Sequence, residues 1–140
     1  MSDALLIPTI ILAFLIVFPL LWSSIVGLIA FQGGWRKLAA SYPAQPSDHA
    51  EWRTMCTGTL GGMFSLGHYK SSLNVGRDIQ YLHLKPFIAF SMFHPQISIP
   101  LSDITRHGNG DSFLTMSRLD FAKSSVPLRV SGKLAKWIMG

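Results

Sequence analysis

The stretch that decides the fold is Ala4–Phe31, ALLIPTIILAFLIVFPLLWSSIVGLIAF, which contains no Asp, Glu, Lys, Arg or His. As an α-helix these 28 residues would extend roughly 42 Å. About 20 apolar residues suffice to cross a hydrocarbon core of about 30 Å. A helix also pairs its backbone groups within itself, as hydrocarbon requires. The sequence therefore predicts a single transmembrane helix within an anchor segment, residues 1–34.

A cleaved signal peptide is the alternative for this segment. Signal peptides have a basic start, an apolar core of about 7–15 residues and a small-residue cleavage site. Here the chain starts with Met1-Ser2-Asp3, and the longer apolar run ends in Ala30-Phe31-Gln32. We therefore expect an uncleaved anchor helix.

The charges that flank the helix predict its orientation. Arg36 and Lys37 follow it closely, and no basic side chain precedes it. The positive-inside rule then places the N-terminus outside and the C-terminal domain in the cytoplasm. We expect the membrane to be the inner (plasma) membrane of a bacterium. Trp35 fits the aromatic belt, so Trp35, Arg36 and Lys37 are the expected membrane-interface residues. The single Cys56 can form no internal disulfide, which agrees with a reducing compartment.

The rest of the chain divides into two parts. Residues 35–51 are expected to form an interfacial segment and a linker that contains Pro43 and Pro46, because proline-containing polar stretches act as stiff spacers. Residues 52–140 are expected to form one small β domain, since a chain of 140 residues has room for little else.

Short apolar runs separated by turn residues characterise most of this domain. Apolar side chains occupy every second position in Ile97–Leu101 and Val126–Val130, as in strands with one buried face. Residues 79–84 are interpreted in the same way, and Asn109-Gly110 is typical of a hairpin. Six or seven such strands predict a small antiparallel sandwich or partial barrel.

The C-terminal residues predict a helix. Leu134, Trp137 and Ile138 lie at positions i, i+3 and i+4, and Lys133 and Lys136 lie on other faces. This spacing is typical of an amphipathic helix of about two turns. We expect it to cover the open side of the sheet.

Two stretches resemble pleckstrin-homology-like domains, including the GRAM group. Leu73–Leu82 resembles the family's strand–turn–strand, and Ile97–Ile104 resembles a strand entering an isoleucine-proline, aspartate-isoleucine corner. The resemblance covers roughly Met55 to Gly140 and implies a binding or scaffolding module without a cofactor. Some members bind phosphoinositides through basic residues in the loop between the first two strands. The matching stretch here, Gly67–Lys70, has one Lys and no Arg.

Metal and catalytic motifs are weak in this sequence. The candidate ligands lack the close pairing that metal sites use; they are His49, His68, His83, His94, His107 and Cys56. Ser, His and Asp occur without a nucleophile elbow. Gly58–Gly62 lacks the Gly-Lys ending of a P-loop and is interpreted as a glycine-rich strand or bulge. We expect a non-enzyme with no metal and no cofactor.

Small residues form a stripe on the anchor. Ser23, Gly27 and Ala30 lie at i, i+4 and i+7, where small side chains let helices approach closely. We interpret them as helix-packing residues, with chance occurrence in a lipid-facing helix as the alternative. Bulky rings next to the stripe can contact lipid, pigment or a neighbouring helix: Phe14, Phe18, Trp22 and Phe31.

Two function hypotheses follow from this organisation. The first is a non-enzymatic accessory or scaffolding subunit of a larger integral-membrane complex, of the photosynthetic reaction-centre or respiratory type. Its helix would pack on partner subunits and its β domain on their cytoplasmic face; in architecture alone this is similar to the H subunit of bacterial reaction centres.

The alternative is a membrane-tethered PH/GRAM-like module that binds anionic lipid headgroups or a cytoplasmic protein. The formal net charge of +5 favours an anionic leaflet. The basic residues are scattered and form no nucleic-acid-binding motif, so nucleic acid is not an expected partner.

Overall fold

The computed structural model describes residues 3–47, 49–61 and 67–140. It contains helices α1 (Asp3–Gln32), α2 (Trp35–Ser41) and α3 (Gly132–Met139). The strands are β1 (Glu51–Leu60), β2 (Gly67–Arg77), β3 (Tyr81–Pro86), β4 (Ile97–Pro100), β5 (Ile104–His107), β6 (Met116–Phe121) and β7 (Ser124–Ser131). Two short 3-10 helices are η1 (Ile88–Phe90) and η2 (Leu101–Asp103). Asp48 of the expected linker and Gly62 of the glycine-rich stretch lie outside the described residues.

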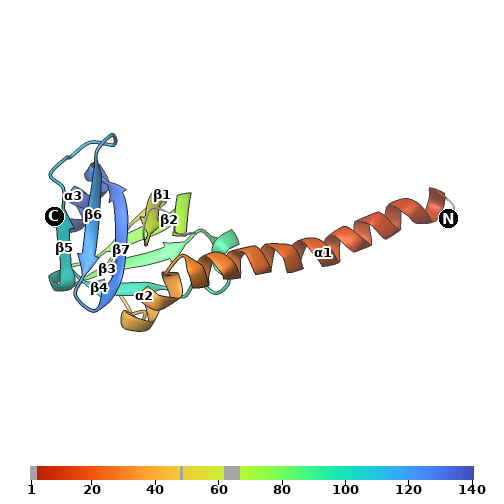
Figure 1. Cartoon of the computed structure of the whole chain (residues 1–140), viewed down its shortest axis with the longest axis horizontal. Coiled ribbons are helices and arrows are strands. Elements are labelled where there is room, and N and C mark those ends of the chain that lie inside the picture. Colours follow the sequence, from red (N-terminus) through yellow and green to blue (C-terminus); the bar gives the residue numbers. More distant parts are fainter. Residues whose placement is uncertain (1–2, 48, 62–66) are drawn as a thin grey trace.

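Helix α1 projects away from the β domain (Figure 1). Its 30 residues measure about 45 Å, and every residue from Asp3 to Leu21 is exposed. Its hydroxyl groups are satisfied within the helix, because Thr9, Ser23 and Ser24 each donate to the carbonyl oxygen four residues earlier. By length and composition alone α1 is able to cross a membrane, a property that signal sequences share.

The seven strands form one antiparallel sheet in the order β4-β3-β2-β1-β7-β6-β5. Strands β1–β4 form one meander and β5–β7 another, and β1 joins the two by pairing with both β2 and β7. The edge strands β4 and β5 are separated in sequence only by η2. The sheet therefore curls into a nearly closed barrel, and helix α3 follows it. The sequence predicted this combination of a small antiparallel β domain and a C-terminal helix.

The seam between the two meanders is short. Only Gly58–Leu60 of β1 pair with Leu128–Val130 of β7, while Glu51–Arg53 and Cys56 pair with β2 alone. Register shifts on both sides of Cys56 bend the strand, and Met55, within the first shift, has φ 55°. Bulges of this kind bend a strand and interrupt its pairing. The first half of β1 is consequently free to diverge from β7.

Helix α2 belongs to the core of the β domain. Trp35 and Leu38 are completely buried, and Tyr42 after the helix is nearly so. Gly34, with φ 93°, supplies the turn between α1 and α2, a conformation that glycine adopts without cost. Residues 35–42, expected as an interfacial segment and linker, therefore contribute core side chains in the structure.

Two further expectations need correction. Gly67–Lys70, compared above with a loop, forms the start of β2. Ile79 is 93% exposed in the turn before β3, and within β3 the three consecutive residues Leu82, His83 and Leu84 are all buried. The strand is thus covered on both faces. Leu82 and Leu84 belong to the core, whereas His83 points to the opposite face, where it is buried and requires polar partners.

Replacing Trp35 tests whether α2 is part of the folded domain. We expect Trp35→Ala to lower the free energy of unfolding by about 3–5 kcal/mol, because a fully buried ring is lost. The neighbouring exposed side chain supplies the control, with Arg36→Ala changing stability by about 0.5 kcal/mol or less. Denaturant unfolding of the full chain in detergent, followed by circular dichroism, measures both. Equal effects would show that α2 lies outside the cooperative unit.

Candidate functional site

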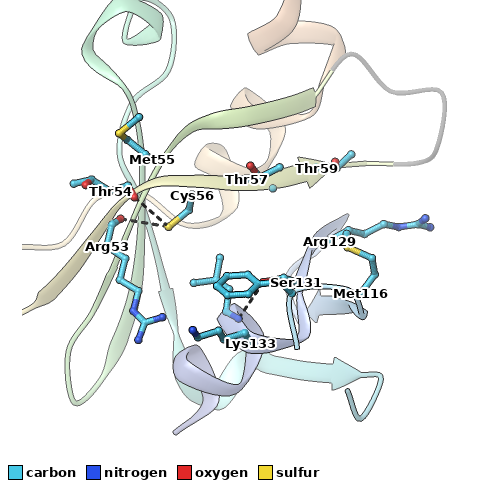
Figure 2. Close-up of a pocket in the computed structure, with 13 residues that line it drawn as sticks. Arg53, Thr54, Met55, Cys56, Thr57, Thr59, Met116, Arg129, Ser131 and Lys133 are labelled. Carbon is cyan, nitrogen blue, oxygen red and sulfur yellow. Dashed lines mark hydrogen bonds between the residues drawn. The ribbon is translucent and has the colours of Figure 1, made fainter. Parts of the chain in front are cut away.

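A cavity of about 630 Å³ lies at the seam between β1 and β7 (Figure 2). One wall is β1, residues 53–59, which includes the diverging part of the strand and the first two residues that pair with β7. The opposite wall is formed by Met116, Arg129 and Ser131, and the start of α3 and Phe113 complete it. The cavity exists because β1 keeps only a short pairing with β7 and then turns away.

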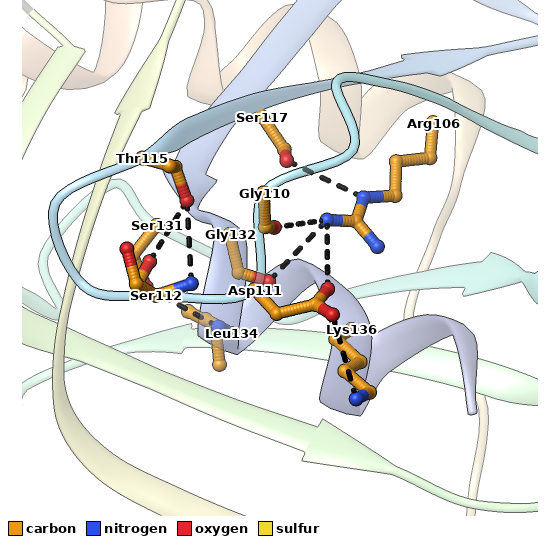
Figure 3. Close-up of polar contacts among 10 residues, drawn as sticks. All are labelled: Arg106, Gly110, Asp111, Ser112, Thr115, Ser117, Ser131, Gly132, Leu134 and Lys136. Atoms are coloured by element: carbon orange, nitrogen blue, oxygen red, sulfur yellow. Dashed lines mark hydrogen bonds and ion pairs between the residues drawn. The ribbon is translucent and has the colours of Figure 1, made fainter.

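The segment that carries Phe113 is fastened to the first turn of α3 (Figure 3). Arg106 donates from Nη2 to the carbonyl oxygens of Gly110 (2.6 Å) and Gly132 (3.5 Å). Asp111 lies 3.8 Å from Arg106 and 3.5 Å from Lys136. The backbone N–H of Gly132 also donates to the Thr115 carbonyl oxygen. These contacts place residues 108–115 beside the cavity.

The lining of the cavity is cationic. Arg53, Arg129 and Lys133 are among its thirteen residues, and none of the thirteen is Asp or Glu. The Arg53 guanidinium lies 4.5 Å from the Trp137 ring and the Lys133 ammonium 4.3 Å from the Phe113 ring, so cation–π contacts hold two of the charges. Apolar side chains, including Met55 and Met116, alternate with them.

Arg129 carries an unsatisfied donor. Its Nε atom is buried and finds no hydrogen-bond partner within the described part of the chain. Buried polar groups are normally paired with protein or water, and a guanidinium prefers an anionic acceptor. The cationic and apolar side chains that line the cavity suit an anionic ligand that also has an apolar part.

Cys56 lines the same cavity but is a poor nucleophile. Burial raises the pKa of its thiol, and the charge of Arg53 opposes this only in part. The Sγ atom lies 3.6 Å from the Arg53 carbonyl oxygen. Because the thiolate is the reactive form, this raised pKa disfavours nucleophilic attack by Cys56.

A buried histidine network joins the linker to β3 and β4. His83 Nε2 donates to Asp78 Oδ2 at 2.7 Å, and His83 Nδ1 lies 2.8 Å from Ser98 Oγ. The Ser98 hydroxyl also accepts from the Gln45 backbone N–H. These are the residue types of a catalytic triad, yet His83 is completely buried, Ser98 is 2% exposed, and neither lines the seam cavity. In this setting the network fastens chain segments together.

The Asp78 carboxylate is stabilised by several donors. Burial raises its pKa, but hydrogen bonds from Ser47, His83 and the backbone N–H groups of Tyr81 and Gln80 outweigh burial and hold the pKa well below its usual range. One signal of this network is local, a histidine within an apolar strand. The partners are separated in sequence and only the fold brings them together.

A second buried cluster joins α2, β2 and the loop between β3 and β4. Trp35 Nε1 donates to the Pro95 carbonyl oxygen at 2.7 Å, and the indole lies against the rings of Tyr69 and His94. Trp35 thus faces the domain interior and is completely buried. That Trp35, Arg36 and Lys37 lie at the membrane interface stays a prediction. Arg36 and Lys37 are exposed.

His94 is the polar centre of this cluster. Its Nδ1 donates to the Met92 carbonyl oxygen at 2.7 Å, and Nε2 accepts from the Tyr69 hydroxyl at 2.8 Å. Burial lowers the pKa of His94, and the charge of Arg36 acts in the same direction, while the Met92 carbonyl opposes it. The lowered pKa favours the neutral form of the buried His94 ring.

The expected helix-packing stripe contacts the chain's own β3–β4 loop. Ser23 Oγ lies 3.3 Å from Met92 Sδ, Gly27 approaches the Phe93 ring, and Ala30 is completely buried. A Cβ atom on Gly27 would lie 3.2 Å from that ring, which accounts for the small residue there. That the stripe packs on partner subunits stays a prediction.

The aromatic residues of α1 form a ladder. Phe14 stacks on Phe18 at 5.2 Å and Phe18 on Trp22 at 6.3 Å. Trp22 contacts Phe90 of the β3–β4 loop, whereas Phe14 and Phe18 are exposed. Contact of these rings with lipid or pigment also stays a prediction.

The described residues contain no group of three or more His, Cys, Asp or Glu side chains that could hold a metal ion. Comparisons with protein-family models, curated proteins and solved structures find no match for this chain. By its volume and its cationic and apolar lining, the seam cavity has the features of a binding site.

The Asp78 network predicts a pH dependence of stability. Because the folded pKa of Asp78 is lowered, its contribution is complete above the unfolded pKa of about 3.9 and is lost as the pH falls towards the folded value. We expect Asp78→Asn to cost about 1–3 kcal/mol at pH 7, with the difference from the native chain shrinking below about pH 4. Asp120→Asn, at a 40% exposed side chain, is the control. A pH-independent difference in unfolding free energy would contradict this account.

Proposed function

We propose that this chain is a membrane-tethered binding module in which α1 spans the bilayer and the β domain binds the headgroup of an anionic lipid in the seam cavity. The observation that carries the proposal is the cavity of about 630 Å³ with three cationic side chains and no acidic one among its thirteen described lining residues. No catalytic step is part of the proposal.

The tether is supported by the properties of α1. Its apolar side chains from Leu5 to Leu21 are exposed and have no partner large enough to cover them among the described residues. Its hydroxyl groups donate within the helix, as a hydrocarbon environment requires. Arg36 and Lys37 after the helix favour a cytoplasmic β domain and an outside N-terminus.

A lipid headgroup is favoured by the position of the cavity. Thr59 and Arg129 line it, and Leu60, the next residue of β1, lies against Gly67. Gly67 in turn packs closely on Gly33 at the end of α1. This part of the cavity thus lies near the end of the proposed anchor, where headgroups are within reach.

The sheet order supports a binding role. Two antiparallel meanders followed by one C-terminal helix are the layout that a PH/GRAM-like domain implies. Gly67–Lys70 lies in β2 and does not line the seam cavity. The proposed binding residues are instead Arg53, Arg129 and Lys133.

Short-chain lipids test the proposal. We expect the full chain in neutral detergent to bind dihexanoyl phosphatidylglycerol or phosphatidylserine and not the phosphatidylcholine analogue. Arg129→Gln should weaken binding about tenfold or more, since a hydrogen bond to a charged group contributes about 1.5–3 kcal/mol. Lys123→Gln removes the same charge from the exposed β6–β7 turn and should leave affinity unchanged. Calorimetry measures the affinities. Equal affinities of the native protein, Arg129→Gln and Lys123→Gln for the anionic lipid would contradict the proposal.

An accessory subunit of a larger membrane complex is the second candidate. It is favoured by the exposed rings of Phe14 and Phe18, which stack on one face of α1 beyond the β domain. Exposed aromatic rings offer a large apolar contact area to a neighbouring helix.

Mild-detergent extraction from native membranes tests this second candidate. We expect stoichiometric partners to be retained with the control pair Leu12→Ala/Ile16→Ala, which lies on the opposite face of α1. The pair Phe14→Ala/Phe18→Ala should release at least half of them, because it removes the ring contacts. Size-exclusion chromatography with mass spectrometry measures retention. Equal retention in both variants would exclude packing through the ring face.

A further inference from the structure

We propose that the β3–β4 loop, residues 87–93, is a second membrane-contacting element that inserts into the interface of the bilayer beside α1. The inference rests on the proposed transmembrane role of α1. In this arrangement lipid covers the exposed apolar surface of the loop. The depth of the loop in the bilayer then sets the position of the β domain.

The loop presents apolar side chains to the surroundings. Its sequence, FIAFSMF, contains no charged residue. Ile88 is 79% exposed, Phe87 48%, Met92 46% and Phe93 45%. Contiguous exposed apolar groups of this kind mark an interaction surface.

The loop is held in a defined position by other elements. Trp22 Nε1 of α1 donates to the Ala89 carbonyl oxygen at 2.8 Å, and the Phe87 backbone N–H donates to the Ser72 carbonyl oxygen at 2.7 Å. The contacts of Trp35 and His94 described above fix its C-terminal end. Backbone groups at each end of the loop are thus already paired, which lowers the cost of placing it in an apolar medium.

The loop lies beside one defined part of α1. Phe90 contacts Trp22 at 5.1 Å, and Phe93 contacts Phe31 at 6.3 Å and Gly27. Residues 4–21, which precede these contacts, are all exposed. Eighteen helical residues measure about 27 Å, close to the hydrocarbon thickness of about 30 Å. The loop therefore coincides in depth with the edge of the hydrocarbon core.

Charged residues border the loop on the side of the β domain. Lys85 precedes it in β3 and is exposed. The Arg36 guanidinium lies 4.9 Å from the Phe31 ring, and Lys37 follows it. Cations at this level face anionic headgroups, while the apolar side chains of the loop face the acyl chains. This continuity with α1 favours lipid over a second protein as the occupant.

Spin labels in vesicles test the inference. The full chain with Cys56→Ser is reconstituted into phosphatidylcholine–phosphatidylglycerol vesicles and carries a single label at Ile88→Cys, Ile79→Cys or Leu12→Cys. Ile79 is a matched control, because it is also a highly exposed isoleucine, at the opposite end of β3. Accessibility to oxygen and to a water-soluble nickel chelate gives the depth of each label.

We expect the label at 88 to lie about 5–10 Å below the headgroup boundary, the usual depth of interfacial apolar elements, with the label at 79 in water and the label at 12 deep in the bilayer. A label at 88 in water, with the label at 12 still deep, would overturn the inference and leave the anchor intact. Shielding of 88 from both reagents would overturn it in favour of a protein contact. A label at 12 in water would overturn the anchor and the inference together.

Discussion

The burial of Trp35 is the contact on which the arrangement of the molecule depends. Its indole fills the core of the β domain and contacts Tyr69, His94 and the Pro95 carbonyl group. Because Trp35 begins α2 and only Gly33-Gly34 separates it from α1, the direction in which α1 leaves the domain follows from this contact. A flexible linker at the same place would leave the domain free to tumble.

The same junction determines which surfaces face the proposed membrane. The close approach of Gly33 and Gly67 sets the start of β2 against the end of α1, since a Cβ on Gly33 would lie 2.7 Å from Gly67 backbone atoms. The β3–β4 loop lies against the last third of the helix. Anchor, apolar loop and one end of the cationic cavity are thereby held in fixed relation to one another.

Polar groups in this fold serve mainly to join segments. The hydrogen bonds of Asp78, His83 and Ser98 hold the segment after α2 against β3 and β4, and Arg106 holds residues 108–115 against α3. Both networks are placed where the chain has little regular pairing. The cavity at the seam differs, because its cationic donors are not matched by acidic partners among the lining residues.

The amino-acid sequence by itself determined the elements whose signal is local: the apolar helix, the alternating residues of β7 and the amphipathic α3. Each follows from apolar composition or periodicity within one segment. Strands β5 and β6 do pair as a hairpin, but Asn109-Gly110 lies within the longer connection of residues 108–115, and neither residue has a positive φ. Only the tertiary structure decided the place of Trp35, which stands beside Arg36 and Lys37 and so has the sequence of an interfacial residue. It also decided the burial of His83 and the seam cavity, which combines residues from 53 to 134. The physical reason is that burial and charge clustering arise from contacts between distant segments, and a single sequence contains no local signal for them.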